Sequence, residues 1–282
     1  MATEVRPSDL AIGIDFGGSG IKGAVVDTRT GQFLGERSRV KTPQPSVPRD
    51  VVAVMDGLVE SLLEPLVAGP GASLTAADAA KLPVGVGIPA ATRSGTTLTA
   101  ANIDSAWIGF QAEREMGLAM GRVVAIGNDA DVAGLAELRF GAGRYQRGTI
   151  IVLTIGTGMG SAIFADGRLL PNTEFGHVEL HGQDAEVRVA ESARDRLGLS
   201  WREWASGFDD YLHLLEKLFW PDLFILGGGA SKRSDNYMQY VTVKTPVAIA
   251  TLKNNAGIVG GALIAVEKRN REAMSAAGEA MG

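Results

Sequence analysis

The sequence predicts an α/β protein, and three observations support this fold class. Short β-branched apolar runs alternate along the chain with longer segments whose apolar residues recur at helical spacing. Two glycine-rich turns, far apart in the sequence, each lie between two such apolar runs. The 282 residues suffice for one large domain or two modest ones, each with its own core. The repeated strand–turn–strand unit favours two similar domains facing one another; the alternative is two unrelated hairpins.

The first half of the chain consists mainly of predicted strands. Apolar runs predict them near residues 11–16, 22–27, 32–41 and 82–88. Prolines at 43, 45 and 48 mark a loop, and the apolar residues that follow recur at helical spacing, which predicts a helix over 49–66. A further strand over 123–126 ends at Gly127, and a helix is predicted over 130–138.

The second half repeats this alternation. Strands are predicted at 150–154, 162–165 and 223–225. Ser200 and Glu203 stand at the spacing of a capping box, in which each side chain satisfies a backbone amide of the other residue. The helix that they begin carries an apolar stripe whose aromatic residues are more typical of a core than of a ligand platform.

Composition and charge exclude several classes of protein. The absence of cysteine excludes a disulfide framework and a thiolate metal site, and it fits a reducing cytoplasm. The first ten residues contain no apolar signal region, and the uncharged stretch 148–165 has the glycines and threonines of a strand–turn–strand unit rather than a membrane helix. A net charge of −5 argues against general affinity for nucleic acid. We therefore expect a cytoplasmic protein with no membrane or nucleic-acid partner, in which any polyanion site gathers its cations locally.

The most informative segment is residues 12–22, where an apolar strand ends at Asp15 and enters a glycine turn. Glycine permits a sharp turn, and successive amides in such a turn form a concave anion site. The chain then returns as a strand, whereas a Rossmann or Walker loop would enter a helix. Asp15 is placed to hold a divalent cation such as Mg²⁺, directly or through water. The predicted phosphate-binding residues of this first hairpin are Asp15, Gly17, Gly18, Ser19, Gly20 and Lys22.

The same arrangement recurs after the strand over 150–154, where a glycine and hydroxyl turn precedes a returning strand. A third glycine cluster follows the strand over 223–225, in a position where phosphate or nucleotide would lie against bare backbone. The predicted phosphate-binding and nucleotide-binding residues of these segments are Thr154, Gly156, Thr157, Gly158, Gly228, Gly229, Lys232 and Arg233.

A carboxylate at a strand end is the candidate catalytic group. Asp129 follows Asn128 at the end of one predicted strand and the start of the next helix. Phosphoryl transfer to an alcohol requires a carboxylate that accepts the hydroxyl proton, which Asp129 would supply. The alternative is that Asn128 or Asp129 only caps the helix, since both residue types are preferred there. The local sequence does not separate these two interpretations.

Together, in their order and spacing, these motifs resemble the ROK family of sugar kinases, from about residue 10 to the helix after Gly260. The family's first loop, Asp-x-Gly-Gly-(Thr/Ser), is matched at residues 15–19, and its second loop at residues 156–160. The resemblance implies a two-lobed, actin-like (ribonuclease H-like) fold with the active site in the cleft between the lobes. It divides the chain into a disordered segment 1–9, a first lobe 10–131 and a second lobe 132–282, whose last helix packs back on the first lobe.

The resemblance also assigns sugar-binding residues. It implies that Asn128 and Asp129 bind the sugar and that Asp129 is the base. Asn102 lies in an Asn-Leu-x-x-Trp-like element, and Glu174 and His177 lie in the family's Glu-x-Gly-His element. Most relatives continue with a cysteine-rich zinc loop, which this chain cannot form, so no structural zinc is expected. Glu186 is a candidate for the third acidic sugar contact, the alternative being a solvated glutamate at a helix start.

The activity implied is transfer of the terminal phosphoryl group of inorganic polyphosphate, and of ATP, to the 6-hydroxyl of glucose, with Mg²⁺ near Asp15 and mannose as a second acceptor. The cysteine-free form resembles the polyphosphate-using branch of the family. One alternative is an ATP-only kinase of glucose or of an amino sugar. Another is a ROK regulator that binds sugar without turnover, but such proteins carry an N-terminal helix-turn-helix and only residues 1–9 precede the first predicted strand. A homodimer is common among relatives.

Overall fold

In the computed structural model, which describes residues 5–70 and 72–279, the chain forms two compact units. The first unit comprises residues 1–136 and 255–282, and the second comprises residues 137–254. The sequence-based division after residue 131 falls inside helix α4 (Asp129–Phe140). The sequence-based division counts the last helix with the second lobe but expects it to pack on the first. This packing is confirmed, and the helix groups with the first unit because it lies on the first sheet.

The N-terminal segment 1–9 is expected to be disordered from the sequence. Residues 1–4 lie outside the described residues. Pro7–Asp9 form a short 3-10 helix instead, with proline at its first position, where a missing amide hydrogen costs nothing. The expectation of disorder is therefore wrong for these three residues.

The first unit is built on a mixed sheet with the strand order β3-β2-β1-β4-β7. Strands β1, β2 and β3 form an antiparallel meander, whereas β4 and β7 run parallel to β1. The carboxyl ends of β1, β4 and β7 consequently lie at one edge of the sheet. The bounds are β1 (Leu10–Gly17), β2 (Gly20–Asp27), β3 (Gln32–Val40), β4 (Val84–Ile88) and β7 (Val124–Asn128).

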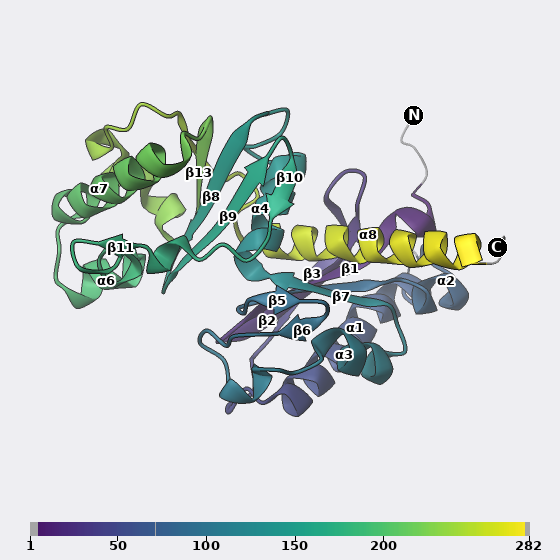
Figure 1. Ribbon diagram of the computed structural model, residues 1–282. Coiled ribbons are helices and arrows are strands. Elements are labelled where there is room, and N and C mark those ends of the chain that lie inside the picture. The colour runs from purple at the N-terminus through teal and green to yellow at the C-terminus, as the bar shows by residue number, and fades with distance from the viewer. Residues whose placement is uncertain (1–4, 71, 280–282) are drawn as a thin grey trace. The chain divides into compact units, whose positions relative to one another are not determined.

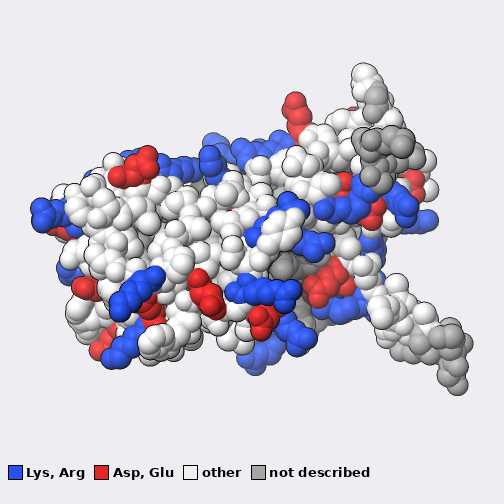
Figure 2. Space-filling view, turned by 90° about the horizontal axis from the view of Figure 1, so that it is seen from above, with Lys and Arg blue, Asp and Glu red and all other residues white. Residues whose placement is uncertain are grey.

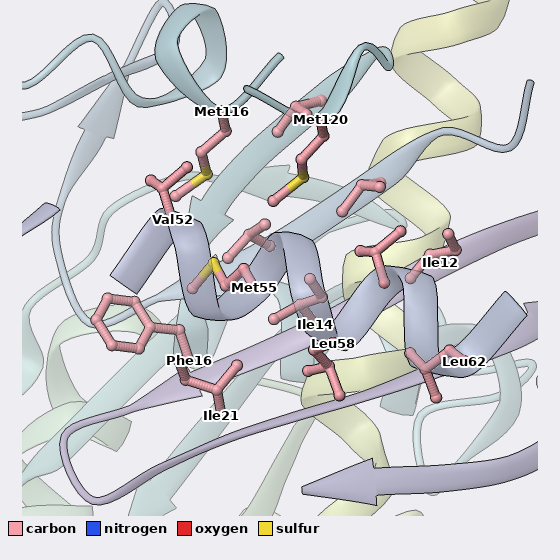
Figure 3. Packing of buried hydrophobic residues seen from close by; sticks show 14 of the residues in the cluster. Ile12, Ile14, Phe16, Ile21, Val52, Met55, Leu58, Leu62, Met116 and Met120 are labelled. Atoms are coloured by element: carbon pink, nitrogen blue, oxygen red, sulfur yellow. The ribbon is translucent and has the colours of Figure 1, made fainter. Parts of the chain in front are cut away.

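Helices cover both faces of this sheet. Helices α1 (Pro48–Val67) and α3 (Ala112–Met120) lie on one face, and α8 (Ala256–Glu279) runs along the other (Figure 1). The apolar residues of β1 interdigitate with α1 in a closed cluster (Figure 3), and burial of each large side chain contributes about 1.5–3 kcal/mol. The cluster includes Ile12, Ile14, Phe16, Ile21, Val52, Met55, Leu58, Leu62, Met116 and Met120.

Helix α8 packs on the first sheet with backbone against backbone, because glycines line the contact. A Cβ atom on Gly13 would lie 1.8 Å from the carbonyl oxygen of Ile258. A Cβ atom on Gly85 would lie 1.8 Å from the carbonyl oxygen of Gly261. No side chain fits at either strand position, so the depth at which α8 sits on the sheet depends on these glycines.

The second unit is built on a second mixed sheet with the order β10-β9-β8-β13-β14. Strands β8 and β9 form an antiparallel hairpin, and β13 runs parallel to β8. The carboxyl ends of β8 and β13 therefore share one edge. The bounds are β8 (Thr149–Ile155), β9 (Met159–Ala165), β10 (Arg168–Leu170), β13 (Leu223–Gly228) and β14 (Val247–Ile249).

Helix α7 (Trp201–Phe219) covers the second sheet and confirms the predicted capping box. The amide of Glu203 donates to the hydroxyl of Ser200, and the amide of Ser200 donates to the Glu203 carboxylate at 2.9 Å. Its apolar stripe is buried, as the spacing predicts. No helix in residues 5–70 or 72–279 is long and apolar enough to cross a membrane. The remaining short elements are α2 (Ala76–Ala80), β5 (Thr92–Arg93), β6 (Thr96–Thr97), β11 (Glu179–Leu180), β12 (Gln183–Asp184), α5 (Glu186–Val189) and α6 (Glu191–Arg196).

Candidate active site

The first glycine turn joins β1 to β2, and two side chains from a later segment hold it by donating to its carbonyl oxygens. The hydroxyl of Thr42 donates to the carbonyl oxygen of Gly17 at 2.6 Å, and the amide side chain of Gln44 donates to that of Gly18 at 3.0 Å. Within the described part of the chain, the backbone amides of Gly18 and Ser19 donate to no protein acceptor. The turn is thus fixed in place while its amide hydrogens remain available to an anion.

Asp15 and Lys22 face one another across this hairpin. The Lys22 Nζ lies 2.7 Å from Asp15 Oδ2, and because both side chains are partly exposed the pair contributes at most about 1 kcal/mol. A Cβ atom on Gly257 would lie 3.0 Å from Asp15 Cγ, so the carboxylate lies against the first turn of α8. The end of α8 that carries the partial positive charge of the helix therefore lies beside this carboxylate.

The first hairpin and Asp129 lie at the same edge of the first sheet. Asp15, Gly87 and Gly127 occupy one row across β1, β4 and β7. Neighbouring strands are about 4.8 Å apart, which places the backbones of Asp15 and Gly127 about 10 Å from each other. Asp129 follows two residues later, at the start of α4. This is the carboxyl edge of the strands, where ligands bind in open α/β sheets.

Asn128, which is buried, provides the cap of helix α4. Its Oδ1 accepts from the amides of Ala130 at 2.9 Å and Asp131 at 3.2 Å, and its Nδ2 donates to the carbonyl oxygen of Ala90 at 3.3 Å. The capping interpretation therefore applies to Asn128. The Oδ1 of Asp129, which is only partly buried, accepts from the amide of Ala130 at 2.8 Å.

Asn102 lies beside the first hairpin. A Cβ atom on Gly18 would lie 2.7 Å from the carbonyl oxygen of Asn102, which itself adopts a left-handed backbone with φ of 60°. Trp107 holds this segment in place. Its buried indole nitrogen donates to the carbonyl oxygen of Ser46 at 2.7 Å, and the centroids of its ring and that of Phe16 lie 5.3 Å apart. The tryptophan of the motif is thus structural, and it fixes Asn102 next to the glycine turn.

The second glycine turn joins β8 to β9 and is built in the same way. The amide and hydroxyl of Ser192 donate to the carbonyl oxygens of Gly156 at 3.2 Å and Thr157 at 2.6 Å. Among residues 72–279, the amides of Thr157 and Gly158 donate to no protein acceptor. Here too the turn carbonyl oxygens accept hydrogen bonds from another segment, and the turn amides remain available to an anion.

The third glycine cluster is brought to the second turn by the pairing of β13 with β8, in which Gly228 lies beside Ile155 and the preceding residue beside Thr154. Gly228 has a φ of 77°, and a Cβ atom there would lie 2.3 Å from the carbonyl oxygen of Ile155, so only glycine fits. The structure thus groups the predicted residues of both segments at one edge of the second sheet.

Two basic residues follow this cluster in different environments. Arg233 Nε lies 3.8 Å from a carboxylate oxygen of Glu191, and another oxygen of that carboxylate would lie 2.1 Å from a Cβ atom on Gly229. Lys232 is exposed and makes no ion pair with a described residue. The charge of Arg233 is therefore partly offset, whereas that of Lys232 is not.

His177 is oriented by a carboxylate that lies later in the chain. Its Nδ1 lies 2.9 Å from Asp184 Oδ2, across the short strands β11 and β12. This hydrogen bond is the main cause that raises the pKa of His177 above its ordinary value, and the charges of Glu186, Asp184 and Glu174 add to it. The imidazolium form is consequently favoured, and Nε2 is left to contact a ligand.

Glu174 and Glu186 lie close to His177 in the second unit. Glu174 is exposed by area but surrounded by protein atoms, and this desolvation raises its pKa; the charge of His177 lowers the pKa and that of Glu186 raises it. Glu186 Oε2 accepts from the amide of Met159 at 3.3 Å, at the end of the second glycine turn. The structure thus brings the three sugar-binding residues predicted in this unit together beside that turn.

No group of three or more His, Asp or Glu residues in the described ranges could hold a metal ion. A cavity of about 860 Å³ lies in the first unit, lined by β6, α3 and α8 residues that include Thr96, Glu113 and Lys268. It contains none of the predicted site residues, and an ion pair between Lys268 and Glu113 crosses its wall. We attach no function to this cavity.

Several residues that shape the site could not be found by motif. Thr42 and Ser192 tie the two turns, and Asp184 orients His177, but each comes from a segment with no recognisable pattern. A different signal was available for Arg37, Arg39 and Lys41. Their period-two spacing in a predicted strand places basic side chains on one face, next to the first turn.

Two mixed five-stranded sheets with flanking helices, each carrying a glycine hairpin at the carboxyl edge, define an actin-like fold. The model of the ROK family matches residues 11–193, and the chain belongs to the ROK family.

Its relatives agree with this assignment. The chain is 44% identical over 255 residues to a polyphosphate glucokinase of Mycobacterium tuberculosis (strain ATCC 25618 / H37Rv), covering 90% of each protein. It is 28% identical to a glucokinase of Streptomyces coelicolor, covering 92% of this chain and 98% of the relative. Among solved structures, the inorganic polyphosphate/ATP-glucomannokinase of Arthrobacter sp. strain KM matches with a TM-score of 0.84 and 44% identity, over 92% of this chain and 99% of that one. A ROK family glucokinase of Streptomyces griseus, in complex with glucose and AMPPNP, matches with a TM-score of 0.73 and 25% identity.

Proposed function

We propose that this chain transfers the terminal phosphoryl group of inorganic polyphosphate, and of ATP, to the 6-hydroxyl of glucose, with mannose as a second acceptor. The observation that carries the proposal is the common edge shared by Asp129 and the first glycine hairpin, in a chain 44% identical to a polyphosphate glucokinase over 90% of its length. A polyphosphate/ATP-glucomannokinase with the same fold supports both donors and both acceptors.

Asp129 acts as the general base in this proposal. Its carboxylate takes the proton of the 6-hydroxyl as that oxygen attacks the terminal phosphorus of the donor. The bond between this phosphorus and the bridging oxygen breaks, which releases ADP or a polyphosphate shortened by one unit. Asn128 holds the helix start in place and keeps one Nδ2 hydrogen that no described acceptor takes, which is available to a sugar hydroxyl.

The remaining residues divide by chemistry. Carboxylates and the imidazole accept from and donate to sugar hydroxyls, and backbone amides and cations bear phosphate charge. We assign the sugar to Asn102, Asn128, Glu174, His177 and Glu186. We assign the donor phosphates to the turns at residues 17–20 and 156–158, to Thr154, Gly228 and Gly229, and to Lys22, Lys232 and Arg233.

Mg²⁺ fits the first hairpin. This ion keeps most of its water and binds through one or two carboxylates together with substrate phosphates, so the single carboxylate of Asp15 suffices. The Lys22 ion pair occupies Oδ2 of Asp15, and the ion would share the remaining capacity of the carboxylate. Bound there, it would neutralise charge on the donor phosphates.

An assay matrix tests the proposal. ATP and long-chain polyphosphate are each supplied with glucose, mannose or N-acetylglucosamine, and sugar phosphate is measured. We expect turnover of glucose with both donors, and weaker turnover of mannose. Turnover with ATP alone, or only with the amino sugar, would replace the proposal by one of the other kinase activities. Sugar binding without any turnover would indicate a regulator.

Two further properties remain proposals on the same basis. Relatives of this family are commonly homodimers, and we propose that state here, to be tested by light scattering of the purified chain. A cytoplasmic location follows from the use of ATP, and fractionation of the source cells tests it.

A further inference from the structure

Three basic residues next to the first glycine turn have no role in the function proposed above. Arg37 and Arg39 lie on β3, the edge strand of the first sheet, and Lys41 follows it. All three are exposed. We call these residues the basic ladder.

Arg39 lies on the same sheet face as Asp15, with Arg37 two residues before it and Lys41 two residues after it in the chain. In the strand register, Arg39 of β3 lies opposite Lys22 of β2, and Lys22 lies opposite Asp15 of β1. Arg37 Nη1 donates to the Asn255 side-chain oxygen at 2.9 Å, immediately before helix α8, which covers this face. Residues two apart on a strand are about 6.8 Å apart, so the ladder extends about 13 Å from the turn along the edge strand.

The guanidinium of Arg39 occupies the space that a side chain at Gly20 would need. A Cβ atom on Gly20 would lie 2.7 Å from both Nε and Nη2 of Arg39. Strand β3 ends at Val40, opposite Ile21, and Lys41 is the next residue along the chain. The Arg39 guanidinium therefore lies beside Gly20, which directly follows the two open amides of Gly18 and Ser19.

The charges of the ladder are not neutralised by the protein. Arg29, Arg122, Lys268 and Arg233 each lie within 4.0 Å of a carboxylate. Among the described residues, no carboxylate lies that close to any member of the ladder. On the face seen in Figure 2, Lys and Arg side chains lie in separate groups, several of them beside Asp or Glu. The ladder therefore keeps its positive charge in a chain with a net charge of −5.

We propose that the basic ladder binds the part of a polyphosphate donor that extends beyond the first glycine turn, and so favours polyphosphate over ATP. The proposal rests on the proposed function and deepens it. Polyphosphate repeats one charge per unit and can span a row of cations, whereas the charge of ATP ends after three phosphates. Because these contacts are between exposed charges, they depend on salt as other polyanion contacts do.

The test compares two variants with equal loss of charge. In the ladder variant, Arg37→Gln, Arg39→Gln and Lys41→Gln remove the row. In the control variant, Arg147→Gln, Arg202→Gln and Lys217→Gln remove three exposed cations of the second unit that make no ion pair with a described residue. Thermal unfolding verifies that both variants are folded.

We expect the KM for long-chain polyphosphate to rise by about 10- to 100-fold in the ladder variant, since each exposed charge contact contributes up to about 1 kcal/mol. The KM values for ATP and tripolyphosphate should change by less than about threefold, because such short donors do not extend along the row. The plot of log KM for polyphosphate against log salt should become shallower by about 2, at about 0.7 per lost contact. Arg39→Lys, which keeps the charge, should stay near the wild type.

Other outcomes overturn the inference. Equal increases in KM for ATP and polyphosphate would place the ladder in a pocket common to both donors. No change with either donor would reduce its role to protection of an edge strand, which exposed charges also provide. If the wild type does not use polyphosphate at all, the proposed function fails on its own. In that case, calorimetric titration with long-chain polyphosphate tests whether the basic ladder binds this polyanion. Equal affinity in the wild type and the ladder variant would refute the proposal.

Discussion

The two glycine hairpins share a backbone design but differ in the charges around them. In both, a hydroxyl side chain from another segment ties a turn carbonyl, Thr42 in the first unit and Ser192 in the second, and the turn amides stay open. The first turn is flanked by the cations Lys22 and Arg39. The second is flanked by carboxylates, including Glu186 at 3.3 Å from the amide of Met159.

This difference shows how one structural device serves two purposes. A turn beside Arg39, whose charge no described carboxylate offsets, is suited to hold a donor of high charge, because the cation stabilises the bound anion. The Glu186 carboxylate beside the second turn suits the hydroxyl groups of a sugar. We infer that the amides of both turns contact donor phosphates, and that Glu186 beside the second turn adds a hydrogen bond to the sugar.

The largest expected effect tests whether Asp129, in the first unit, is the general base. Asp129→Asn keeps the shape of the side chain but cannot accept a proton, so kcat should fall by roughly 10²- to 10⁴-fold. Calorimetry should show that glucose affinity changes much less. Near-normal turnover with intact binding would show that another carboxylate is the base and that Asp129 only supports the start of α4.

The second prediction concerns the packing that supports the first hairpin. Gly85→Ala would place a Cβ atom 1.8 Å from the carbonyl oxygen of Gly261, so helix α8 must shift, at a cost of about 3 kcal/mol or more. Gly57→Ala is the control, because nothing lies within 4 Å of a Cβ atom at that exposed position in α1. That change should stabilise by about 0.4–1 kcal/mol. Thermal unfolding measures both, and a Gly85→Ala protein as stable as the wild type would contradict the close packing of α8.

The sequence predicted the parts of this protein that local patterns encode. The α/β class, the strands that enter both glycine turns and the capping box at Ser200 follow from periodicity and from residue preferences over a few positions. The first residues of the site, from Asp15 to Lys22, lie in one continuous motif. Such features depend on contacts between residues close in sequence.

The remainder depends on contacts between distant residues. Helix α8 joins the first unit because glycines far earlier in the sequence, such as Gly13 and Gly85, leave room for it, and no local sequence pattern predicts that fit. Likewise Arg233 can be read as a free cation until the fold places Glu191 beside it. The sequence leaves open whether Asn128 or Asp129 caps α4, and the fold shows the Asn128 side chain accepting from the amides of Ala130 and Asp131.

The third prediction compares the two hairpins directly. Thr42→Val and Ser192→Ala each remove one hydroxyl that donates to a turn carbonyl oxygen. Loss of this hydrogen bond destabilises the conformation of that turn by about 0.5–1.5 kcal/mol. We expect the KM for ATP and for polyphosphate to rise together, by about 2- to 12-fold, because the turn amides would contact phosphates that both donors share. Steady-state kinetics with the two donors measures this. A rise confined to polyphosphate would mean that the altered turn contacts only the extended chain.

The smallest effect concerns the carboxylates of the second unit. Asp184→Asn weakens the hydrogen bond that raises the pKa of His177, so this pKa should fall and the imidazolium should lose its proton at lower pH. Proton NMR titration of the imidazole measures the shift. Asp210→Asn is the matched control, since Asp210 lies 3.2 Å from His181 instead and should leave His177 unchanged.

The same change predicts the sign of the pH dependence. A histidine whose pKa is raised by folding adds stability below its unfolded value of about 6.5, and this contribution disappears as the pH rises through the raised value. The loss of stability in Asp184→Asn should therefore be greatest in mild acid and vanish in alkali, and it should be well under 1 kcal/mol because both side chains are more than half exposed. If His177 binds glucose as an imidazolium, the KM for glucose should begin to rise at lower pH in the variant than in the wild type. An unchanged pH profile alongside a lowered pKa would show that Asp184 orients His177 but that the charge of the ring does not contribute to sugar binding.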